Sequence, residues 1–379
     1  MNGAAERDEP TTSTAAVDAV VQAGGPRLTA LLERTESRLV ELAAGHGDTL
    51  ARHATATISA GGKRLRPLLV FLTAGEGLSE AAEARLVRAA AAFELIHSAS
   101  LVHDDVLDGA ALRRGAPTVI ATAGRTVATA TGDLLFSRAF AELAVGGEID
   151  DVRALSAAAS SLAAGELMQR ADAWDATVPL ERYLHRCELK TGSLFEAACR
   201  LGALGGGLGF RPSATASGRL PVTSPDPATA SGPPADADFR PPTTASGPPA
   251  GDVTERLALF GRRIGLAFQL LDDVLDVSGP ASRTGKARGT DLLDGTVTLP
   301  LILARERDPE LARLDLRELT TPAEAEQVCE RIAATGALAA AKEQALAVVA
   351  AARADLPPLP PAQHHALELV AEGVVERYG

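Results

Sequence analysis

The sequence has few aromatic residues, few cysteines and no long uncharged apolar run. Phe, Trp and Tyr together make up 3% of its 379 residues, although hydrophobic residues as a whole make up 46%. Val and Ile rarely alternate with polar residues, and the abundance of Ala and Leu favours helix over strand. We therefore expect an all-α protein.

Basic charge is also scarce. The formal net charge is −12, whereas a nucleic-acid-binding surface needs clustered Lys and Arg to replace counterions. This argues against a nucleic-acid partner. The three cysteines, Cys187, Cys199 and Cys329, lack metal-ligand spacing and cannot all pair, so we expect reduced thiols in a cytoplasmic protein.

Neither a membrane span nor a signal peptide is indicated. No segment offers the roughly eighteen uncharged apolar residues that a spanning helix needs. The first residues, MNGAAERDEP, lack a basic region followed by an apolar one. The sequence predicts a soluble protein with no integral membrane segment.

Two stretches are too polar to bury a core. Residues 1–18 are small and acidic, and we expect a disordered tail. Residues 207–251 are rich in Pro, Gly, Ser and Thr and contain three copies of Thr-Ala-Ser-Gly, which predicts a flexible insertion. The insertion is either a linker between two domains or a loop within one, since a long loop costs little extra closure entropy.

An aspartate cluster ends the helical stretch before Gly109. On a helix Asp104 and Asp108 lie one turn apart, with Asp105 beside them. Oxygen ligands without nearby His or Cys suit Mg²⁺. A single motif of this length, taken alone, is more typical of a solvated helix terminus.

A second apolar helical stretch, FQLLDDVLD, ends in the same spacing at Asp272, Asp273 and Asp276. Two such helices facing each other would line a cavity able to hold Mg²⁺ ions around a diphosphate. The helices on both sides of the insertion would then belong to one bundle. We therefore expect residues 19–379 to form one domain, interrupted by an extruded loop.

Basic residues stand at three places near these motifs. Lys63, Arg64 and Arg66 occur in GGKRLRP, two arginines follow the first cluster, and Lys190 precedes Thr191. Arg presents a fork to phosphate oxygens and Lys a point charge. The pattern predicts two anionic sites, one bridged by metal and one bound by side chains alone.

Four motifs occur in a characteristic order: GGKRLRP, LIHSASLVHDDVLDGAALRRGAPT, KTGSLFEAA and FQLLDDVLD. They resemble those of the trans-isoprenyl diphosphate synthases, the polyprenyl synthetase family, over about residues 26–206 and 253–379. The resemblance implies an isoprenoid-synthase-type bundle of antiparallel helices around a central cavity, usually as a homodimer. It also implies an enzyme that condenses isopentenyl diphosphate with an allylic prenyl diphosphate to give a linear trans-polyprenyl diphosphate.

The resemblance further implies roles for individual residues. The residues implied to hold Mg²⁺ on the allylic diphosphate are Asp104, Asp108 and Asp272, helped by Asp105, Asp273 and Asp276. Those implied to contact that diphosphate are Arg113, Lys190 and Gln169. Those implied to bind isopentenyl diphosphate are Lys63, Arg66, His97 and Arg114, and those near the nascent cation are Thr191 and Gln269.

One position departs from the family pattern. Thr296, after Gly295, stands where many members carry a lysine that contacts the allylic diphosphate. Lys286 precedes it and is a candidate substitute. The departure puts one diphosphate contact in question but not the reaction.

The product tail is expected to grow along the helix that carries Asp104. Ala99, Ile96 and Phe93 follow one another at about one-turn intervals on this helix, and one turn rises about 5.4 Å, roughly one isoprene unit. Small residues just before the first cluster favour a product of twenty or more carbons, in the medium-to-long range.

Two alternatives remain open at this point. A class I terpene cyclase needs only one aspartate-rich motif and an aromatic-lined pocket, so the second motif, GGKRLRP and the scarcity of aromatics count against it. A non-catalytic partner subunit of a prenyl synthase would be expected to have lost motif residues. Thr296 alone supports that alternative.

Overall fold

The computed structural model describes residues 12–44, 47–113, 115–207, 252–279 and 288–376. Apart from Gly207, the predicted insertion at 207–251 lies outside these ranges, as do Arg114 and Lys286.

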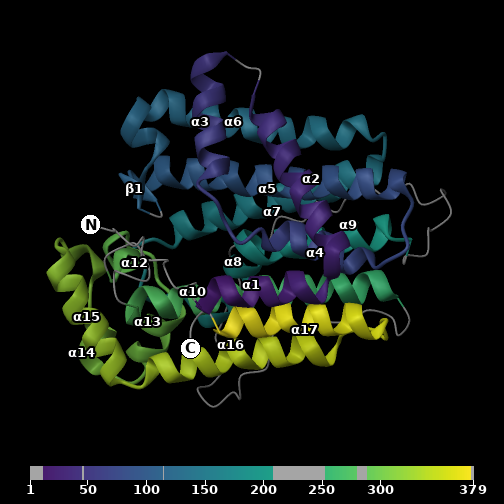
Figure 1. The fold of residues 1–379 in the computed structure, drawn as a ribbon. Helices are drawn as coiled ribbons and strands as arrows, with labels where there is room; N and C mark the ends of the chain where they lie inside the picture. Colours follow the sequence, from purple (N-terminus) through teal and green to yellow (C-terminus); the bar gives the residue numbers. More distant parts are fainter. Residues whose placement is uncertain (1–11, 45–46, 114, 208–251, 280–287, 377–379) are drawn as a thin grey trace, which may run out of the picture.

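The described chain is almost entirely helical, and the predicted all-α class is confirmed (Figure 1). The only strands in the described ranges form a short antiparallel pair, β1 (Leu112–Arg113) and β2 (Ala116–Pro117). The helical elements are α1 (Thr12–Ala23), α2 (Gly25–Ala43), α3 (Asp48–Ser59), α4 (Leu65–Ala74), α5 (Glu80–Asp108), α6 (Val119–Val145), α7 (Ile149–Ala171), α8 (Leu180–Cys187), η1 (Glu188–Gly192), α9 (Ser193–Gly205), α10 (Val253–Ser278), α12 (Thr290–Leu293), α13 (Leu299–Arg305), α14 (Pro309–Arg313), η2 (Leu316–Glu318), α15 (Pro322–Ala334), α16 (Ala337–Ala354) and α17 (Pro361–Glu376).

Helix α5 forms the centre of one half of the molecule and packs against α2, α4, α6 and α9 (Figure 1). It begins where the Ser79 hydroxyl accepts a hydrogen bond from the backbone N–H of Ala82, with Glu80 in the first turn, an arrangement that satisfies and complements the helix N-terminus. It ends at Gly109, whose φ of 62° suits a residue without a side chain. The local sequence thus fixes both ends of the helix that carries the first aspartate cluster.

Helices α9 and α10, which flank the insertion, pack closely against each other. A Cβ atom at Gly261 would lie 2.5 Å from the backbone oxygen of Phe195, and one at Gly265 would lie 2.9 Å from the Cα atom of Gly192. The glycines therefore let two backbones approach to a distance that a side chain would prevent. The chain before residue 207 and the chain after 252 share one packed core.

The N-terminal region differs from the expected tail of residues 1–18. Helix α1 begins at Thr12 and packs along α17. Val17, Val20 and Val21 recur at helical spacing, and Val20 is 3% exposed. This apolar stripe, hidden in a polar composition, explains why the helix starts before residue 19; residues 1–11 lie outside the described chain.

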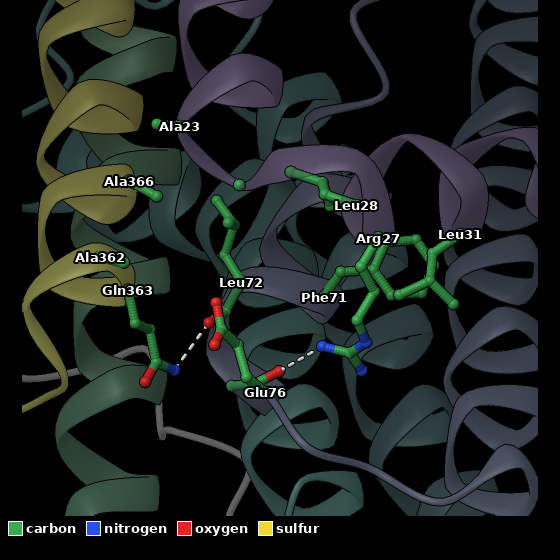
Figure 2. Close-up of a pocket in the computed structure, with 12 residues that line it drawn as sticks. Ala23, Arg27, Leu28, Leu31, Phe71, Leu72, Glu76, Ala362, Gln363 and Ala366 are labelled. Atoms are coloured by element: carbon green, nitrogen blue, oxygen red, sulfur yellow. Dashed lines mark hydrogen bonds between the residues drawn. The ribbon is translucent and has the colours of Figure 1, made fainter.

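A small cleft of about 40 Å³ lies where the start of α2, the end of α4 and the start of α17 meet. Gln363 Nε2 donates to the backbone oxygen of Leu72 at 2.7 Å, and Arg27 Nη1 donates to that of Gly75 at 2.8 Å (Figure 2). No residue of either aspartate cluster lines it. The cleft lies between three helices, and no motif residue lines it.

No single helix in the described ranges is long and apolar enough to cross a membrane. Helices α15 and α16 satisfy the length and composition only when taken together, and the chain bends by 71° between them.

Candidate active site

The first aspartate cluster occupies the last turns of α5. Asp105 is buried, Asp104 is half-buried and Asp108 is exposed. The β1–β2 turn folds back over the helix end, so Arg113 Nε donates to Asp105 Oδ1 at 2.8 Å. Asp104 and Asp108 share the face expected from their spacing, whereas Asp105 is held by an arginine eight residues later.

The lysine of the KT motif lies beside this cluster. Lys190 Nζ is 2.5 Å from Glu166 Oε2 of α7 and donates to Gln169 Oε1 at 3.3 Å. Burial alone would lower the pKa of the Lys190 ammonium, but the negative charges of Asp104 and Glu166 outweigh it and the pKa is raised. Burial raises the pKa of the Asp104 carboxyl, and nearby Lys190 opposes that rise.

Lys190 and Thr191 lie in η1, a single π-helical turn. This turn packs against both α7 and α10. The approach to α7 requires Gly165, because a Cβ atom there would lie 2.5 Å from the Lys190 backbone nitrogen. A π turn widens the helix locally and recurs at functional sites; here it brings two neighbouring residues toward different helices.

The second cluster is linked to η1 by a chain of hydrogen bonds. Thr191 Oγ1 donates to Gln269 Oε1 at 2.8 Å, and Gln269 Nε2 donates to Asp273 Oδ1 at 2.8 Å. Tyr183 of α8 donates its hydroxyl to Asp273 Oδ2 at 2.6 Å. Thr191 and Gln269, which the resemblance implies to be near the nascent cation, are in direct contact. Tyr183 carries no local signal in the sequence, because its partner Asp273 is 90 residues away.

Asp273 is buried, and burial raises the pKa of its carboxyl to about 7, with the nearby Asp291 adding to the rise. The hydrogen bonds from Tyr183 and Gln269 act in the opposite direction. Asp276 Oδ2 accepts from the backbone N–H of Asp291 at 3.3 Å. Asp272 is half-buried on α10, so the three aspartates of this cluster occupy different environments.

The basic residues of GGKRLRP divide between two roles. Arg64 adopts a left-handed backbone with φ of 49° and pairs with Glu36 at 2.5 Å and with Glu94 at 2.7 Å. Arg66 lies over the Phe195 ring, 4.6 Å from its centroid, and burial lowers the pKa of its guanidinium to about 10. Its Nε is enclosed and has no hydrogen-bond partner within the described chain. An enclosed, unsatisfied donor is suited to an anion.

The remaining predicted residues lie as follows. Lys63 is half-buried just before α4 and His97 is half-buried on α5. The three predicted chain-length residues, Ala99, Ile96 and Phe93, are completely buried on α5. They lie inside the bundle and not on its surface. The backbone N–H of Thr296 donates to the backbone oxygen of Asp291 at 2.8 Å.

The aspartate carboxylates can bind a divalent metal ion only if other groups supply the remaining ligands. Within the described ranges, three or more Asp, Glu, His or Cys side chains nowhere gather closely enough to hold a metal by themselves. Mg²⁺, however, commonly takes one or two protein carboxylates and completes its shell with water and substrate phosphate oxygens. The hard oxygen donors of Asp104, Asp108 and Asp272 suit that arrangement and not an all-protein cage.

Comparison with known proteins gives three findings. The Polyprenyl synthetase family model matches residues 48–216 and 242–335. Heptaprenyl diphosphate synthase component 2 of Geobacillus stearothermophilus is 36% identical over 65% of this chain and 64% of its own length, and nonaprenyl diphosphate synthase of Mycobacterium tuberculosis is 31% identical over 98% of this chain and 99% of its own. The crystal structure of a polyprenyl synthase from Caulobacter crescentus CB15, complexed with calcium and isoprenyl diphosphate, superposes with a TM-score of 0.76 at 30% identity, covering 96% of this chain and 98% of that one.

Proposed function

Because this chain belongs to the polyprenyl synthetase family, we propose that it condenses isopentenyl diphosphate with an allylic prenyl diphosphate to form a linear trans-polyprenyl diphosphate. It is an enzyme that transfers prenyl groups. The names of its heptaprenyl and nonaprenyl relatives support a product of medium or long chain. Family membership also counts against the terpene cyclase alternative.

The observation that carries the proposal is the position of η1 between the two aspartate clusters. Lys190 lies in the field of Asp104 on α5, while the next residue, Thr191, is hydrogen-bonded to Gln269 one turn before Asp273 on α10. Two adjacent residues thus connect helices that carry the same motif. This supports a single site in which both clusters act on one diphosphate.

We assign the metal contacts to Asp104, Asp108 and Asp272, with Asp105, Asp273 and Asp276 in support. Mg²⁺ bound there would neutralise the negative charge that develops on the departing diphosphate. The relative from Caulobacter crescentus CB15 holds calcium and isoprenyl diphosphate, which supports a divalent cation at a diphosphate site.

The side chains of this enzyme supply the remaining electrostatics. Lys190, Gln169 and Arg113 orient the allylic diphosphate, and their positive or polar groups stabilise charge as the C–O bond breaks. The carbonyl oxygen of Gln269 and the hydroxyl of Thr191 provide dipoles for the carbocation. Released diphosphate is a suitable acceptor for the proton that leaves after condensation.

Isopentenyl diphosphate is assigned to Lys63, Arg66, His97 and Arg114. Arg66 carries the structural support, because its buried Nε has no partner in the described chain and its guanidinium is held against Phe195. Burial strengthens attraction to an anion relative to water. Arg114 remains a proposal from the sequence, since it lies outside the described residues.

We further propose a homodimer in the cytoplasm. The three cysteines are buried free thiols, which suits a reducing compartment. Light scattering after size-exclusion chromatography tests the dimer, and a monomer that is fully active would contradict it.

The purified full-length protein, Mg²⁺, radiolabelled isopentenyl diphosphate and allylic primers of increasing length provide the direct test. We expect a ladder of linear polyprenols after dephosphorylation. Asp104→Asn should reduce kcat at least about 100-fold, because it removes a proposed ligand of the metal that neutralises the charge developing on the departing diphosphate. Asp150→Asn, at an exposed position on α7, is the matched control and should be near wild type.

One relative carries the name component 2, which favours a second candidate, one subunit of a two-component synthase, as in the partner-subunit alternative. The same assay distinguishes the candidates. A protein that forms long products alone is a complete synthase. A protein that is inactive alone and active only with a second polypeptide belongs to a two-component enzyme, and no incorporation under either condition would overturn both.

A further inference from the structure

We propose that Arg170 is a resident counter-cation of the first aspartate cluster: it holds Asp108 in the metal-free protein and must release it when a divalent cation binds. None of the sequence motifs includes this residue. The inference rests on the proposed function, in which Asp108 is a metal ligand.

The geometry of Arg170 supports a bridging role. Its Nη2 lies 2.6 Å from Asp108 Oδ1 at the end of α5, and its Nε lies 2.8 Å from Glu166 Oε1, one turn earlier on α7. Asp108 is 62 residues away in sequence. One guanidinium therefore joins the end of α5 to α7.

Charges alternate along the contact chain that includes Arg170. The order is Asp108, Arg170, Glu166 and Lys190, with the Lys190 ammonium 2.5 Å from the second carboxylate oxygen of Glu166. Burial alone would lower the pKa of the Arg170 guanidinium, but its hydrogen bonds with Asp108 and Glu166 raise it. The proposed metal ligand at one end is thus linked to the KT lysine at the other.

The Arg170–Asp108 ion pair is partly exposed, so a metal ion from solvent can replace Arg170 at the Asp108 carboxylate. The side chains of Arg170 and Asp108 are 36% and 28% exposed. A long side chain at this rim can swing into water while keeping its backbone position on α7. A divalent cation at Asp108 would repel the guanidinium at such short range. Arg170 and the metal therefore compete for the same carboxylate.

Removing Arg170 should consequently strengthen metal binding. Arg170→Gln removes both a competitor for Asp108 and a positive charge. The Mg²⁺ concentration that gives half of the maximal rise in Tm should therefore fall about fivefold, the size expected for a partly exposed ion pair. Arg170→Lys retains the charge and should stay near wild type. Arg153→Gln removes a positive charge elsewhere on α7, where Arg153 is 72% exposed, and serves as the matched control.

The measurement is the thermal unfolding midpoint of the full-length protein, titrated with Mg²⁺ at a fixed saturating concentration of inorganic pyrophosphate. We expect a lower Tm for Arg170→Gln than for wild type without metal, and a lower Mg²⁺ midpoint with pyrophosphate. If Arg170 has only a structural role, Arg170→Gln should lower the Tm without metal and leave the Mg²⁺ midpoint unchanged.

An unchanged or higher Mg²⁺ midpoint in Arg170→Gln would overturn the inference while leaving the proposed function intact, provided that wild type responds to Mg²⁺. A higher midpoint would indicate that Arg170 binds the diphosphate itself. If wild-type Tm does not respond to Mg²⁺ at all, both the inference and the metal assignment fail.

Discussion

At the scale of single residues, the aspartates of the predicted site differ in exposure and in the groups that contact them. Asp105 is held by Arg113, and Asp273 is held by Tyr183 and Gln269. Asp108 faces water at the rim, and Asp272 is half-buried. Aspartates that look equivalent in the sequence therefore differ in environment, and substitutions should separate them.

Asp273→Asn should alter the pH dependence of stability. The folded-state pKa of about 7 lies above the usual value of 3.8, so the folded protein binds more protons than the unfolded chain in that interval. The contribution of the protonated Asp273 carboxyl to the free energy of unfolding is fully present below about pH 4 and is lost as the pH rises to about 7. An amide does not titrate, so the free energy of unfolding of the variant does not fall for this reason.

Urea unfolding of metal-free wild type and Asp273→Asn between about pH 4 and pH 8 measures the effect, since the linkage slope follows proton uptake. The free energy of unfolding of the variant, relative to that of wild type, should increase as the pH rises. This difference between the two proteins should become constant above about pH 7. Parallel curves would show that Asp273 is ionised throughout.

Ala99→Phe should shorten the product. Ala99 is completely buried on α5, one turn before the first cluster, and a phenyl ring added there fills space in the bundle without removing a proposed catalytic group. Product sizing should show a shift to shorter polyprenols with turnover retained. A normal product distribution in a folded variant would mean that the growing tail does not pass Ala99.

At the scale of elements, the sequence identified the aspartate-bearing helices because their signals are local. Gly109 ends α5, and apolar periodicity before each motif marks its helix. The sequence did not identify η1 as a π turn, because its geometry depends on how closely α7 approaches at Gly165. It also missed the long-range partners, Tyr183 for Asp273 and Arg170 for Asp108, since pairing across 90 and 62 residues leaves no periodic signal.

Gly165→Ala should damage both stability and activity. The added methyl group would lie 2.5 Å from the Lys190 nitrogen, and moving α7 away from η1 should cost about 1–3 kcal/mol in the free energy of unfolding. Lys190 would move with η1, so kcat should fall as well. Denaturant unfolding and steady-state kinetics measure the two effects.

Gly146→Ala is the control for Gly165→Ala, because Gly146 has an ordinary helical φ of −69°. The atoms nearest to the added Cβ would be those of the flexible Arg88 side chain and the Leu143 backbone oxygen, at 3.3–3.4 Å. Equal loss of stability in the two variants would contradict the packing argument.

At the scale of the whole molecule, the helices on both sides of the predicted insertion form one core. The duplicated motif predicts this arrangement, and the packing of α9 on α10 gives it a physical basis. The predicted disordered tail of residues 1–18 was wrong from Thr12 onward, where the few valines of α1 are stabilised by α17 at the opposite end of the chain. Composition alone cannot report a partner so distant in sequence.

Replacing residues 207–251 by a short Gly-Ser linker should leave Tm, kcat and product length near wild type. The reason is that α9 and α10 are held together by their own backbone contacts and not by the segment between them. Thermal unfolding and product sizing on the deletion variant test this. A loss of activity with an unchanged Tm would assign the segment a functional role.

The π turn also sets the rotational phase between α8 and α9. Successive α-helical residues are about 100° apart around the axis, and a π turn accommodates one extra residue without changing which faces point inward. Deleting a single residue within Glu188–Gly192 would therefore let this turn close to an ordinary α-helical turn, with α8 and Tyr183 kept in phase. The widened backbone that directs Lys190 and Thr191 toward different helices would be lost, although the flanking helices kept their inward faces.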